Sequence, residues 1–568
     1  MTANIEIYKD IAIHAIESVY ESEYHNTLGI PMPQIKILMP DDADYITGQY
    51  YIMIDDTWQI HLNFGKLPIS FKEFEDEVKV LTRHEIEHYM CCPFDVITHL
   101  RMLKCIIDVY RKDFSHLGID IQHACGSISN QAADIIVDTK NYLRNPQDTL
   151  ISEINWIKKG ANIKNCPRHS KLMFLTKEAL WETSLEINET DQDLLAIVHE
   201  LADKFKVNGI EDKASFLSKT REYARTFFNL YIKDKLSPHN EGLQDSQSQQ
   251  GNQSQQGSQS QQGGYNISPA KPKDGDENGS AFVFADPDKI KEAITALAGE
   301  TDVQEFADVL SAAGIKSLNE SEKYKLWFSI QGDNIIPIEE YINSGNKEEY
   351  TFPSTWRIGD PIGTLDIMLS FQTSPKILPG ITTKKWEKTT NAINGVEKKN
   401  RDLLLVLDTS GSMKNVLDES SNMHQAVLAA YGIISYFEKI QGKIALIEFS
   451  ERVGVNINWT NDYEDVRNQL LVNGQGGTTF PISAIRNTID NSKNEIVTII
   501  ITDGELGNLQ ESLNYFREYI DNDNILYIFI IGQSRTLANY ERLKDIGAKV
   551  FQSNKAEEFC NMVMDDIG

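Results

Sequence analysis

The sequence predicts a multidomain chain, with an α+β N-terminal domain extended by helices and an α/β C-terminal domain. The chain has 568 residues, which is too long for one ordinary hydrophobic core. Residues 244–264 contain only Gln, Ser, Gly, Asp and Asn, and so lack the apolar side chains that offset the entropy of ordering. Residues 401–568 alternate between short apolar runs and amphipathic segments. That alternation is typical of a buried parallel sheet covered on both faces.

The N-terminal domain is expected over residues 1–165 and begins with a predicted helix over 4–20. Residues 58–64 alternate strictly between apolar and polar side chains, which predicts a half-buried strand. Residues 71–90 carry apolar side chains at helical spacing and predict a helix. Beyond this domain, a helical extension is expected over 166–240. Helical segments are predicted over most of 96–112, 126–144, 170–205 and 213–235.

The low-complexity tract lies inside an expected flexible linker, residues 241–280. A mixed connector over 281–400 follows, with short helices predicted at 288–298 and 302–313. The C-terminal domain, residues 401–568, is predicted to be a doubly wound, mostly parallel sheet. Its strands are predicted at 402–408, 443–450, 495–501, 525–532 and 548–552, and its helices at 421–440, 481–490, 508–521, 536–546 and 555–566.

Composition restricts the classes of partner. Lys and Arg total 55 against 83 Asp and Glu, a formal charge of −28, so the overall field does not favour nucleic acid or anionic lipid. No apolar run approaches the roughly 20 residues needed to span a bilayer, and the first residues do not resemble a secretory signal. The six cysteines form no CxxC pair, which favours a reducing, cytoplasmic setting over a disulfide framework.

Residues 84–88 read His-Glu-Ile-Glu-His, an HExxH motif within a predicted helix. His84 and His88 are four residues apart and therefore lie on one helical face, where they can bind one zinc ion. Glu85 lies beside them and can act as the general base toward a water molecule. The alternative interpretation is a charged, solvated helix face, because acidic residues are frequent nearby.

A third zinc ligand is expected from a later helix. Asn130, Asp134 and Asp138 follow one another at four-residue steps on an otherwise apolar segment. Polar side chains in one row on a buried helix need a partner, and a metal site is one such partner.

Other residues compete for places at this site. His99, His116 and His123 are rival third ligands, although each is more simply an ordinary surface or hydrogen-bonded histidine. Cys91 and Cys92 follow the motif directly and could supply a thiolate, but buried structural thiols are the commoner case.

A second metal site is predicted at the carboxyl ends of the C-terminal strands. Asp408, Ser410 and Ser412 follow an apolar strand in an Asp-x-Ser-x-Ser pattern, Thr478 follows two glycines, and Asp503 ends another apolar strand. Carboxylate and hydroxyl oxygens suit Mg²⁺ better than zinc. Open α/β sheets bind their ligands at this edge.

The two sets of motifs resemble a known group of proteins. HExxH followed by an Asn-x-Ala-x-Asp-like helix is similar to bacterial and archaeal proteins that combine an N-terminal zincin-like metallopeptidase domain with a C-terminal von Willebrand factor type A (VWA) domain. The resemblance implies that Asp134 is the third zinc ligand and that Asn130 and Asp138 orient the ligands. Asp138 stands where asparagine is expected in relatives.

Residues 401–568 resemble a VWA domain with a metal-ion-dependent adhesion site (MIDAS). This resemblance implies a Mg²⁺ ion held by the five residues Asp408, Ser410, Ser412, Thr478 and Asp503. It also implies an open coordination position that a carboxylate of a protein partner can fill.

Relatives are commonly associated with MoxR-type AAA+ ATPases. The leading interpretation is therefore a zinc metallopeptidase coupled to a Mg²⁺-dependent protein-binding module that works with such an ATPase on protein clients. The rival interpretation is a non-catalytic adaptor between ATPase and client, with the HExxH domain as a scaffold. A surface adhesin is disfavoured by the missing signal peptide and disulfides. The chain has no GxxxxGK[ST] motif, so ATP hydrolysis would belong to another chain.

Overall fold

The structure is a computed structural model. It describes residues 2–25, 32, 34–38, 50–54, 59–64, 70–160, 163, 166–236, 287–315, 318–336, 348–356, 365–366, 370, 383–390, 401–492, 494–504, 506, 508–532 and 540–567. The linker expected over 241–280 lies outside these residues. The chain divides into two compact units, Met1–Tyr324 and Lys325–Gly568.

The first unit opens with helices packed on a small sheet. Its first elements are α1 (Thr2–Val19), the π-helical turn η1 (Tyr20–Tyr24), β1 (Gln34–Leu38), β2 (Tyr50–Ile54), β3 (Gln59–Phe64) and α3 (Phe71–Met90). The strand order is β1-β3-β2, with β3 parallel to β1 and antiparallel to β2. Phe74, Val78 and Ile86 of α3 are fully buried in one core with α1 and β3. Ser70 caps α3 by accepting a hydrogen bond from the backbone of Glu73.

Helices make up most of the rest of this unit. They are α4 (Val96–Val109), η2 (Tyr110–Phe114), η3 (Ser115–Leu117), α5 (Ile121–Arg144), α6 (Pro146–Gly160), α7 (Arg168–Trp181), α8 (Gln192–Lys206), η5 (Lys213–Ser215) and α9 (Phe216–Leu236). Helix α5 contacts α3, α4, α6, α7 and α9 and is therefore central to the unit. The prediction of helix across 170–205 was wrong at its centre, because α7 ends where Glu182 adopts a left-handed conformation.

Two helices beyond residue 286 also belong to the first unit. They are α10 (Pro287–Ala298) and α11 (Val303–Ala312), which the sequence analysis assigned to a connector. Both pack against α4, and α11 also packs against α5. Val303, Phe306 and Leu310 of α11 are completely buried.

Two sheets are formed by the described residues of the second unit. The division between the units falls within α12 (Glu320–Ile335). A small antiparallel sheet follows with the order β4-β6-β5, formed by β4 (Glu348–Thr355), β5 (Leu365–Asp366) and β6 (Lys384–Thr390). The larger sheet has the order β12-β11-β10-β7-β8-β9. Its strands are β7 (Asp402–Asp408), β8 (Ile444–Phe449), β9 (Val453–Thr460), β10 (Ile496–Thr502), β11 (Ile525–Ile531) and β12 (Lys549–Ser553).

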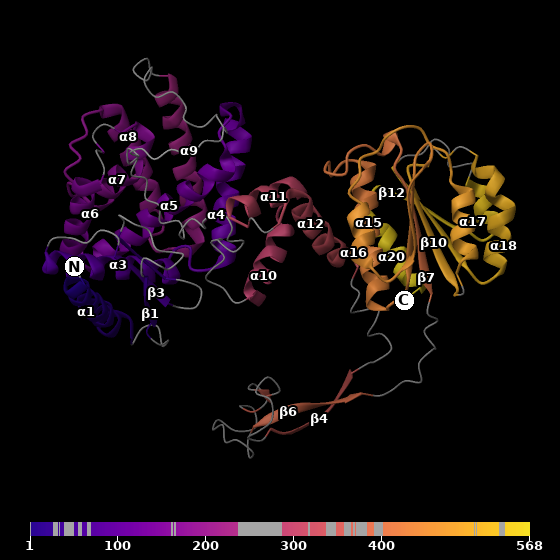
Figure 1. Cartoon of the computed structure of the whole chain (residues 1–568), viewed down its shortest axis with the longest axis horizontal. Coiled ribbons are helices and arrows are strands. Elements are labelled where there is room, and N and C mark those ends of the chain that lie inside the picture. Colours follow the sequence, from indigo (N-terminus) through magenta and orange to yellow (C-terminus); the bar gives the residue numbers. More distant parts are fainter. Residues whose placement is uncertain are drawn as a thin grey trace. The chain divides into compact units, whose positions relative to one another are not determined.

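This larger sheet confirms the mostly parallel α/β prediction, since only β9 runs antiparallel among its described strands. Its helical segments are η9 (Gly411–Met413), α15 (Asn422–Lys439), α16 (Tyr463–Gln469), α17 (Ile482–Asp490), η10 (Leu509–Ser512), α18 (Leu513–Asp521), α19 (Glu541–Asp545) and α20 (Ala556–Ile567). Helices α15 and α20 cover one face, and α17 and α18 cover the other (Figure 1). Every residue of β7 and β10 is consequently buried.

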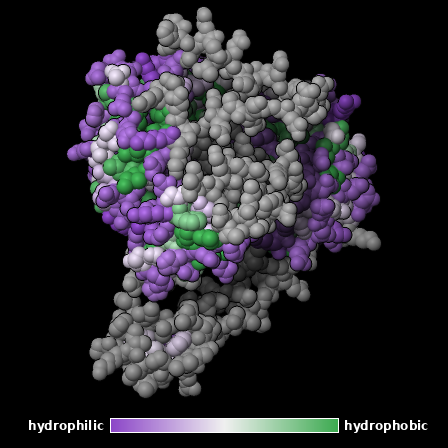
Figure 2. Space-filling view, turned by 60° about the vertical axis from the view of Figure 1, so that its left-hand side comes forward, coloured by the Kyte–Doolittle hydropathy of each residue, from purple (hydrophilic) through white to green (hydrophobic). Residues whose placement is uncertain are grey.

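Hydrophilic side chains dominate the described surface on the face shown in Figure 2, and hydrophobic ones gather there in small groups. Within the described ranges, no helix combines the length and apolar character that crossing a membrane requires. All six cysteines are free thiols, and five of them are buried.

Candidate metal centres

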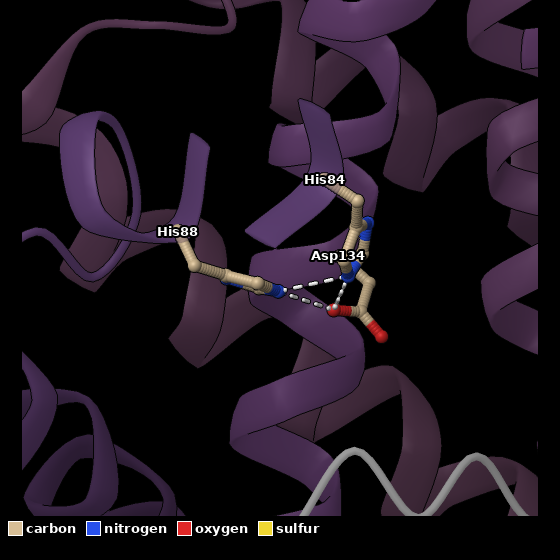
Figure 3. A group of neighbouring side chains, drawn as sticks. All are labelled: His84, His88 and Asp134. Atoms are coloured by element: carbon tan, nitrogen blue, oxygen red, sulfur yellow. Dashed lines mark hydrogen bonds and ion pairs between the residues drawn. The ribbon is translucent and has the colours of Figure 1, made fainter. Parts of the chain in front are cut away.

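The HExxH motif lies in the last two turns of α3, and α5 faces it. His84 and His88 of α3 converge with Asp134 of α5, and all three ligand atoms lie within 4.8 Å of one another (Figure 3). The two Nε2 atoms are 3.0 Å apart, and Oδ1 of Asp134 lies 3.2 Å from Nε2 of His88 and 3.6 Å from Nε2 of His84. A tetrahedral zinc ion with ligands at about 2.0–2.2 Å separates its ligand atoms by about 3.3 Å. The spacing therefore fits a zinc ion.

Hydrogen bonds orient both imidazole rings. Nδ1 of His84 lies 2.7 Å from Oδ1 of Asp138, and Nδ1 of His88 lies 2.8 Å from the carbonyl oxygen of Cys92. Both oxygens can only accept, so each Nδ1 carries the proton and donates it. When both rings are neutral, their Nε2 lone pairs point toward each other, and a shared cation stabilises that arrangement.

Asp134 is only 1% exposed, and its two carboxylate oxygens differ in their surroundings. Oδ2 accepts a hydrogen bond of 3.1 Å from Nδ2 of Asn130. Oδ1 is buried and has no hydrogen-bond partner among the described residues. A buried carboxylate oxygen without a donor is costly, and a metal ion at the point where both Nε2 atoms meet would remove that cost.

The carboxylates also dominate the electrostatics of this centre. Burial lowers the pKa of His84, but the charges of Asp138 and Asp134 outweigh burial and raise the pKa to about 10. Burial, and secondarily the charge of Asp134, raises the pKa of Tyr223 on α9 well above its ordinary value. This negative field favours any cation, whether a proton or a metal ion, between the histidines.

Glu85 lies next to His84 on α3 and is 7% exposed, and its charge adds to the field that raises the pKa of His84. The rival ligands do not join the group of three within the described part of the chain. Burial lowers the pKa of His99 to about 4, and His116 is exposed on η3. The side chain of His123 lies outside the described set.

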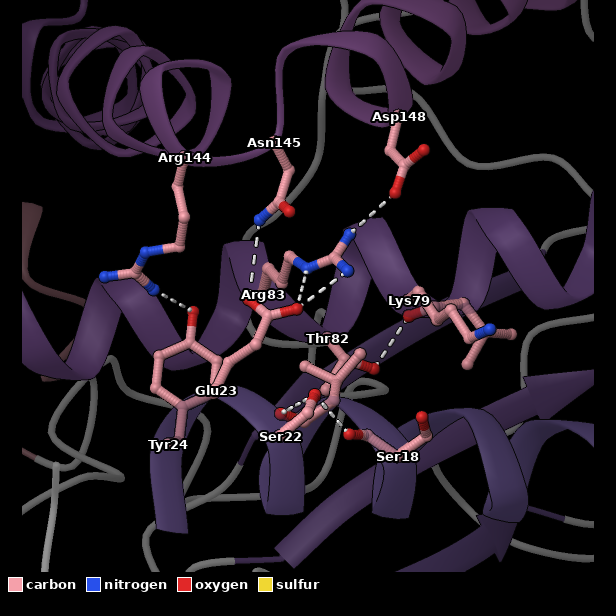
Figure 4. Close-up of polar contacts among 12 residues, drawn as sticks. Ser18, Ser22, Glu23, Tyr24, Lys79, Thr82, Arg83, Arg144, Asn145 and Asp148 are labelled. Atoms are coloured by element: carbon pink, nitrogen blue, oxygen red, sulfur yellow. Dashed lines mark hydrogen bonds and ion pairs between the residues drawn. The ribbon is translucent and has the colours of Figure 1, made fainter. Parts of the chain in front are cut away.

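Two ion-pair networks fix the motif helix, and neither was predicted from the sequence. Arg83 donates to Glu23 at 2.8 Å and reaches Asp148 at 3.5 Å (Figure 4). Glu87 is fully buried and accepts from Tyr24. It also pairs with Lys140 and Arg144 at 2.8 and 3.0 Å. These contacts tie α3 to η1, α5 and α6 at positions directly before His84 and His88. Single charged residues in a helix gave no signal that they would be buried.

The second candidate centre lies at the carboxyl end of β7. Asp408 is completely buried and accepts hydrogen bonds from the backbone of Ser410 at 2.9 Å and from Oγ1 of Thr502 at 2.7 Å. Oγ of Ser410 lies 3.2 Å from Oγ of Ser412, which is exposed. Asp503 is 8% exposed and follows β10, the neighbour of β7 in the sheet. The residues of the Asp-x-Ser-x-Ser loop therefore present oxygen atoms at one edge.

The segment before Thr478 packs against this loop. The backbone of Gln475 donates to the carbonyl of Thr409 at 2.8 Å, and that of Gly411 donates to the carbonyl of Gly476 at 2.9 Å. A Cβ atom at Gly474 would clash with the carbonyl oxygen of Ser410, so the close approach requires glycine there. Thr478 itself is half-buried.

The field at this edge also favours a cation. Burial raises the pKa of Asp408, and the charge of Asp503 adds to the rise, against hydrogen bonds from Thr502 and Ser410 that lower it. Tyr540, which the sequence analysis missed, donates to the carbonyl of Gly504 at 3.0 Å. Burial raises the pKa of Tyr540, and the charges of Asp408 and Asp503 add to the rise. Two carboxylates with hydroxyl groups form a donor set that fits Mg²⁺.

Residues 403–505 match the family model of the von Willebrand factor type A domain. The chain therefore contains a VWA-type domain, and the MIDAS-like residues Asp408, Ser410, Ser412, Thr478 and Asp503 all lie inside the matched segment. No curated protein matches the chain.

Solved structures with similar parts share little sequence with this chain. The conserved hypothetical protein BatB from Bacteroides thetaiotaomicron is 15% identical, covers 29% of this chain and 97% of its own, and has a TM-score of 0.24. An aerotolerance-related membrane protein from Bacteroides fragilis is 16% identical, with coverages of 29% and 99% and a TM-score of 0.23. The Deinococcus radiodurans Ro (RSR) protein is 11% identical, with coverages of 74% and 88% and a TM-score of 0.18.

Proposed function

We propose that the first unit is a zinc-dependent, zincin-like metallopeptidase domain and that the VWA domain is a Mg²⁺-dependent protein-binding module. The observation that carries the first part is the convergence of His84, His88 and Asp134, with both Nδ1 atoms already donating elsewhere. The negative field and the unpartnered Oδ1 of Asp134 support the same proposal.

The proposed reaction is hydrolysis of a peptide bond. A zinc ion held by His84, His88 and Asp134 would polarise the peptide carbonyl and acidify a water molecule. Glu85 would accept a proton from the attacking water and then donate it to the leaving amine. Asp138 and the Cys92 carbonyl would keep the two rings in the tautomer that presents Nε2 to the metal.

The VWA domain would select what reaches the peptidase. A Mg²⁺ ion bound by Asp408, Ser410, Ser412, Thr478 and Asp503 would leave a position for a carboxylate of a partner. By the resemblance, the partner is a MoxR-type AAA+ ATPase or its protein client. The six free cysteines support a cytoplasmic location.

The metal content of the purified full-length protein tests the central step. We expect about one zinc ion per chain in the wild type and none in His84→Ala, measured by inductively coupled plasma mass spectrometry. His116→Ala is the matched control, because this exposed histidine lies outside the group of three, and it should retain the zinc. Full zinc in His84→Ala would place the metal elsewhere.

A second candidate function is a non-catalytic adaptor that links the ATPase to its client. The burial of the site favours it, since Asp134, His84 and Glu85 are 1%, 6% and 7% exposed. Closed sites of this kind are typical of structural zinc, whereas catalytic zinc keeps an open position. The scaffold of the adaptor can be zinc-stabilised or metal-free, so the presence of zinc does not distinguish the two candidates, whereas hydrolysis assays do.

A further inference from the structure

A buried lysine lies behind the first metal centre. Lys177 of α7 is completely buried, and its Nζ donates to Oδ2 of Asp138 at 2.5 Å and to Oε1 of Glu153 at 2.9 Å. Asp138 belongs to α5 and Glu153 to α6, so the ammonium group joins three helices. The other oxygen of Asp138, Oδ1, accepts the hydrogen bond from Nδ1 of His84.

Isolated buried charges are strongly unfavourable, and buried ion pairs often contribute little to stability compared with apolar side chains of similar size. The Lys177 group is therefore poorly explained as a device for stability alone. The position of Lys177 explains the group better, because the Asp138 carboxylate connects its ammonium group directly to the proposed zinc ligand His84. Burial alone would lower the pKa of Lys177, but the carboxylates of Asp138 and Glu153 outweigh that effect. The net result is a raised pKa, so the side chain is charged.

We propose that Lys177 is a positioning residue of the metal centre, which holds the Asp138 carboxylate where it fixes the tautomer and orientation of His84. Glu153 is the second counter-ion of the lysine. This inference rests on the proposed zinc site. The inference adds that zinc affinity depends on Lys177. This residue belongs to neither metal-binding motif and does not contact the metal.

The pair makes a specific prediction about compensation. Without Lys177, the Asp138 carboxylate loses its counter-ion and is free to rotate away from His84. An asparagine at position 138 could accept the Nδ1 hydrogen bond through its amide oxygen and would need no cation. Removing the charges of Lys177 and Asp138 together should therefore restore the zinc affinity that is lost when the lysine alone is removed.

The test compares zinc affinity of the full-length wild type with Lys177→Met and Asp138→Asn/Lys177→Met, by competition with a chromophoric chelator. We expect Lys177→Met to weaken zinc binding by about 10- to 100-fold and the double variant to recover to within about fivefold of the wild type. Lys323→Met is the matched control and should change affinity by less than about twofold. Lys323 is 5% exposed and bonds Ser311 and Glu320, away from the ligands.

The absorption spectrum of the Co²⁺-substituted protein gives a second readout that a purely structural lysine would not change. Its ligand-field bands should shift in Lys177→Met and return in the double variant. Wild-type zinc affinity in folded Lys177→Met overturns the inference and leaves the proposed zinc site intact. If Lys177→Met does not fold, the double variant decides the question. A folded double variant that binds zinc as tightly as the wild type supports the inference. A folded double variant that binds zinc more than about 10-fold more weakly overturns it. A wild type that binds no zinc overturns both proposals.

Discussion

Nε2 of His88 on α3 lies 3.2 Å from Oδ1 of Asp134 on α5, and neither helix depends on the other for its own hydrogen bonds. Packing of α3 against α5 brings these two atoms together. Asn130 donates a hydrogen bond to the other oxygen of Asp134, and Asp138 accepts one from His84. Because Oδ1 is buried without a hydrogen-bond partner in the described structure, the pair is arranged for a cation.

The first prediction separates metal binding from catalysis. Glu85→Gln should keep about one zinc ion per chain, because the three proposed ligands are unchanged, but should lower peptide hydrolysis at least about 100-fold by removing the proposed general base. Metal content and cleavage of a quenched fluorescent peptide library measure the two properties on the same samples.

Glu77→Gln is the control, since this residue is on the same helix but two turns before the motif, and it should leave both properties unchanged. Wild-type protein that binds zinc and cleaves nothing, alone or with the proposed AAA+ ATPase partner, would favour the adaptor. Loss of zinc in Glu85→Gln would contradict an acid–base role.

The second prediction concerns the way the first unit is held together. A protease site inserted within residues 241–280 should give two fragments that remain associated after cleavage, because α10 and α11 pack on α4. Exposed ion pairs such as Arg101–Glu300 contribute only about 0–1 kcal/mol each, so association should persist in 1 M salt. Buried apolar contact dominates, and Phe306→Asp should separate the fragments.

Size-exclusion chromatography of the cleaved protein measures this association. Asp308→Ala is the matched control, since it removes the partially exposed partner of Arg111 and leaves the apolar face of α11 unchanged. Fragments that separate without any substitution would mean that the α10–α11 contact needs the intact chain.

The sequence predicted the helices and strands whose own pattern of apolar and polar residues is clear. All five predicted strands of the larger sheet are present. Four of them are mainly apolar runs that the sheet buries, whereas the edge strand β12 is only partly buried. The edge strand β9 was missed although Val453, Val455, Ile457 and Trp459 alternate with polar residues, which is the signal of a half-exposed strand. Helices α6 and α12 were missed because their polar sequences form helices only in contact with neighbouring elements.

The candidate sites show the same limit. HExxH and Asp-x-Ser-x-Ser are local patterns, so their residues could be named from the sequence. The supporting groups could not be named, because Lys177, Arg83 and Glu87 are ordinary helical residues until tertiary packing buries them. A charged side chain is buried only where other helices supply its partners. The spacing of residues within one helix does not indicate which residues those partners are.

The third prediction is a pH dependence in the second unit. Glu448 of β8 is 3% exposed, its Oε1 has no hydrogen-bond partner in the described residues, and burial raises its pKa from 4.5 to about 8. An acid with a raised folded-state pKa contributes stability that is complete below its unfolded value and is lost as the pH rises through the folded value. The second unit should therefore lose stability as the pH rises from 4.5 to about 8, by on the order of 5 kcal/mol at most.

Calorimetric unfolding of the full chain at several pH values measures this slope. Glu448→Gln should flatten it, because the amide does not ionise. Glu557→Gln removes an exposed glutamate of α20 and should leave the slope unchanged. An equal slope in the wild type and in Glu448→Gln would show that this carboxyl group is not the cause.

The fourth prediction concerns capture of a partner by the VWA domain, which we expect to require both Mg²⁺ and the Asp-x-Ser-x-Ser loop. Asp408→Ala is a poor test, because Asp408 is completely buried and its loss leaves Ser410 and Thr502 without their acceptor, at a cost of about 1–3 kcal/mol. Ser412→Ala is better, since Ser412 is exposed and its removal takes away a proposed metal ligand with little effect on the core.

In the wild type, Mg²⁺ should raise the unfolding temperature of the VWA domain, since an ion that binds only the folded state stabilises it, and EDTA should reverse the rise. Ser412→Ala should shift less at the same Mg²⁺ concentration and recover less AAA+ ATPase from a native lysate. Ser420→Ala, beyond the same loop, is the control, because its hydroxyl bonds only Asp418 among the described contacts and should not affect the ion. Equal recovery by the wild type and Ser412→Ala, with and without EDTA, would mean that the partner is held through a different surface.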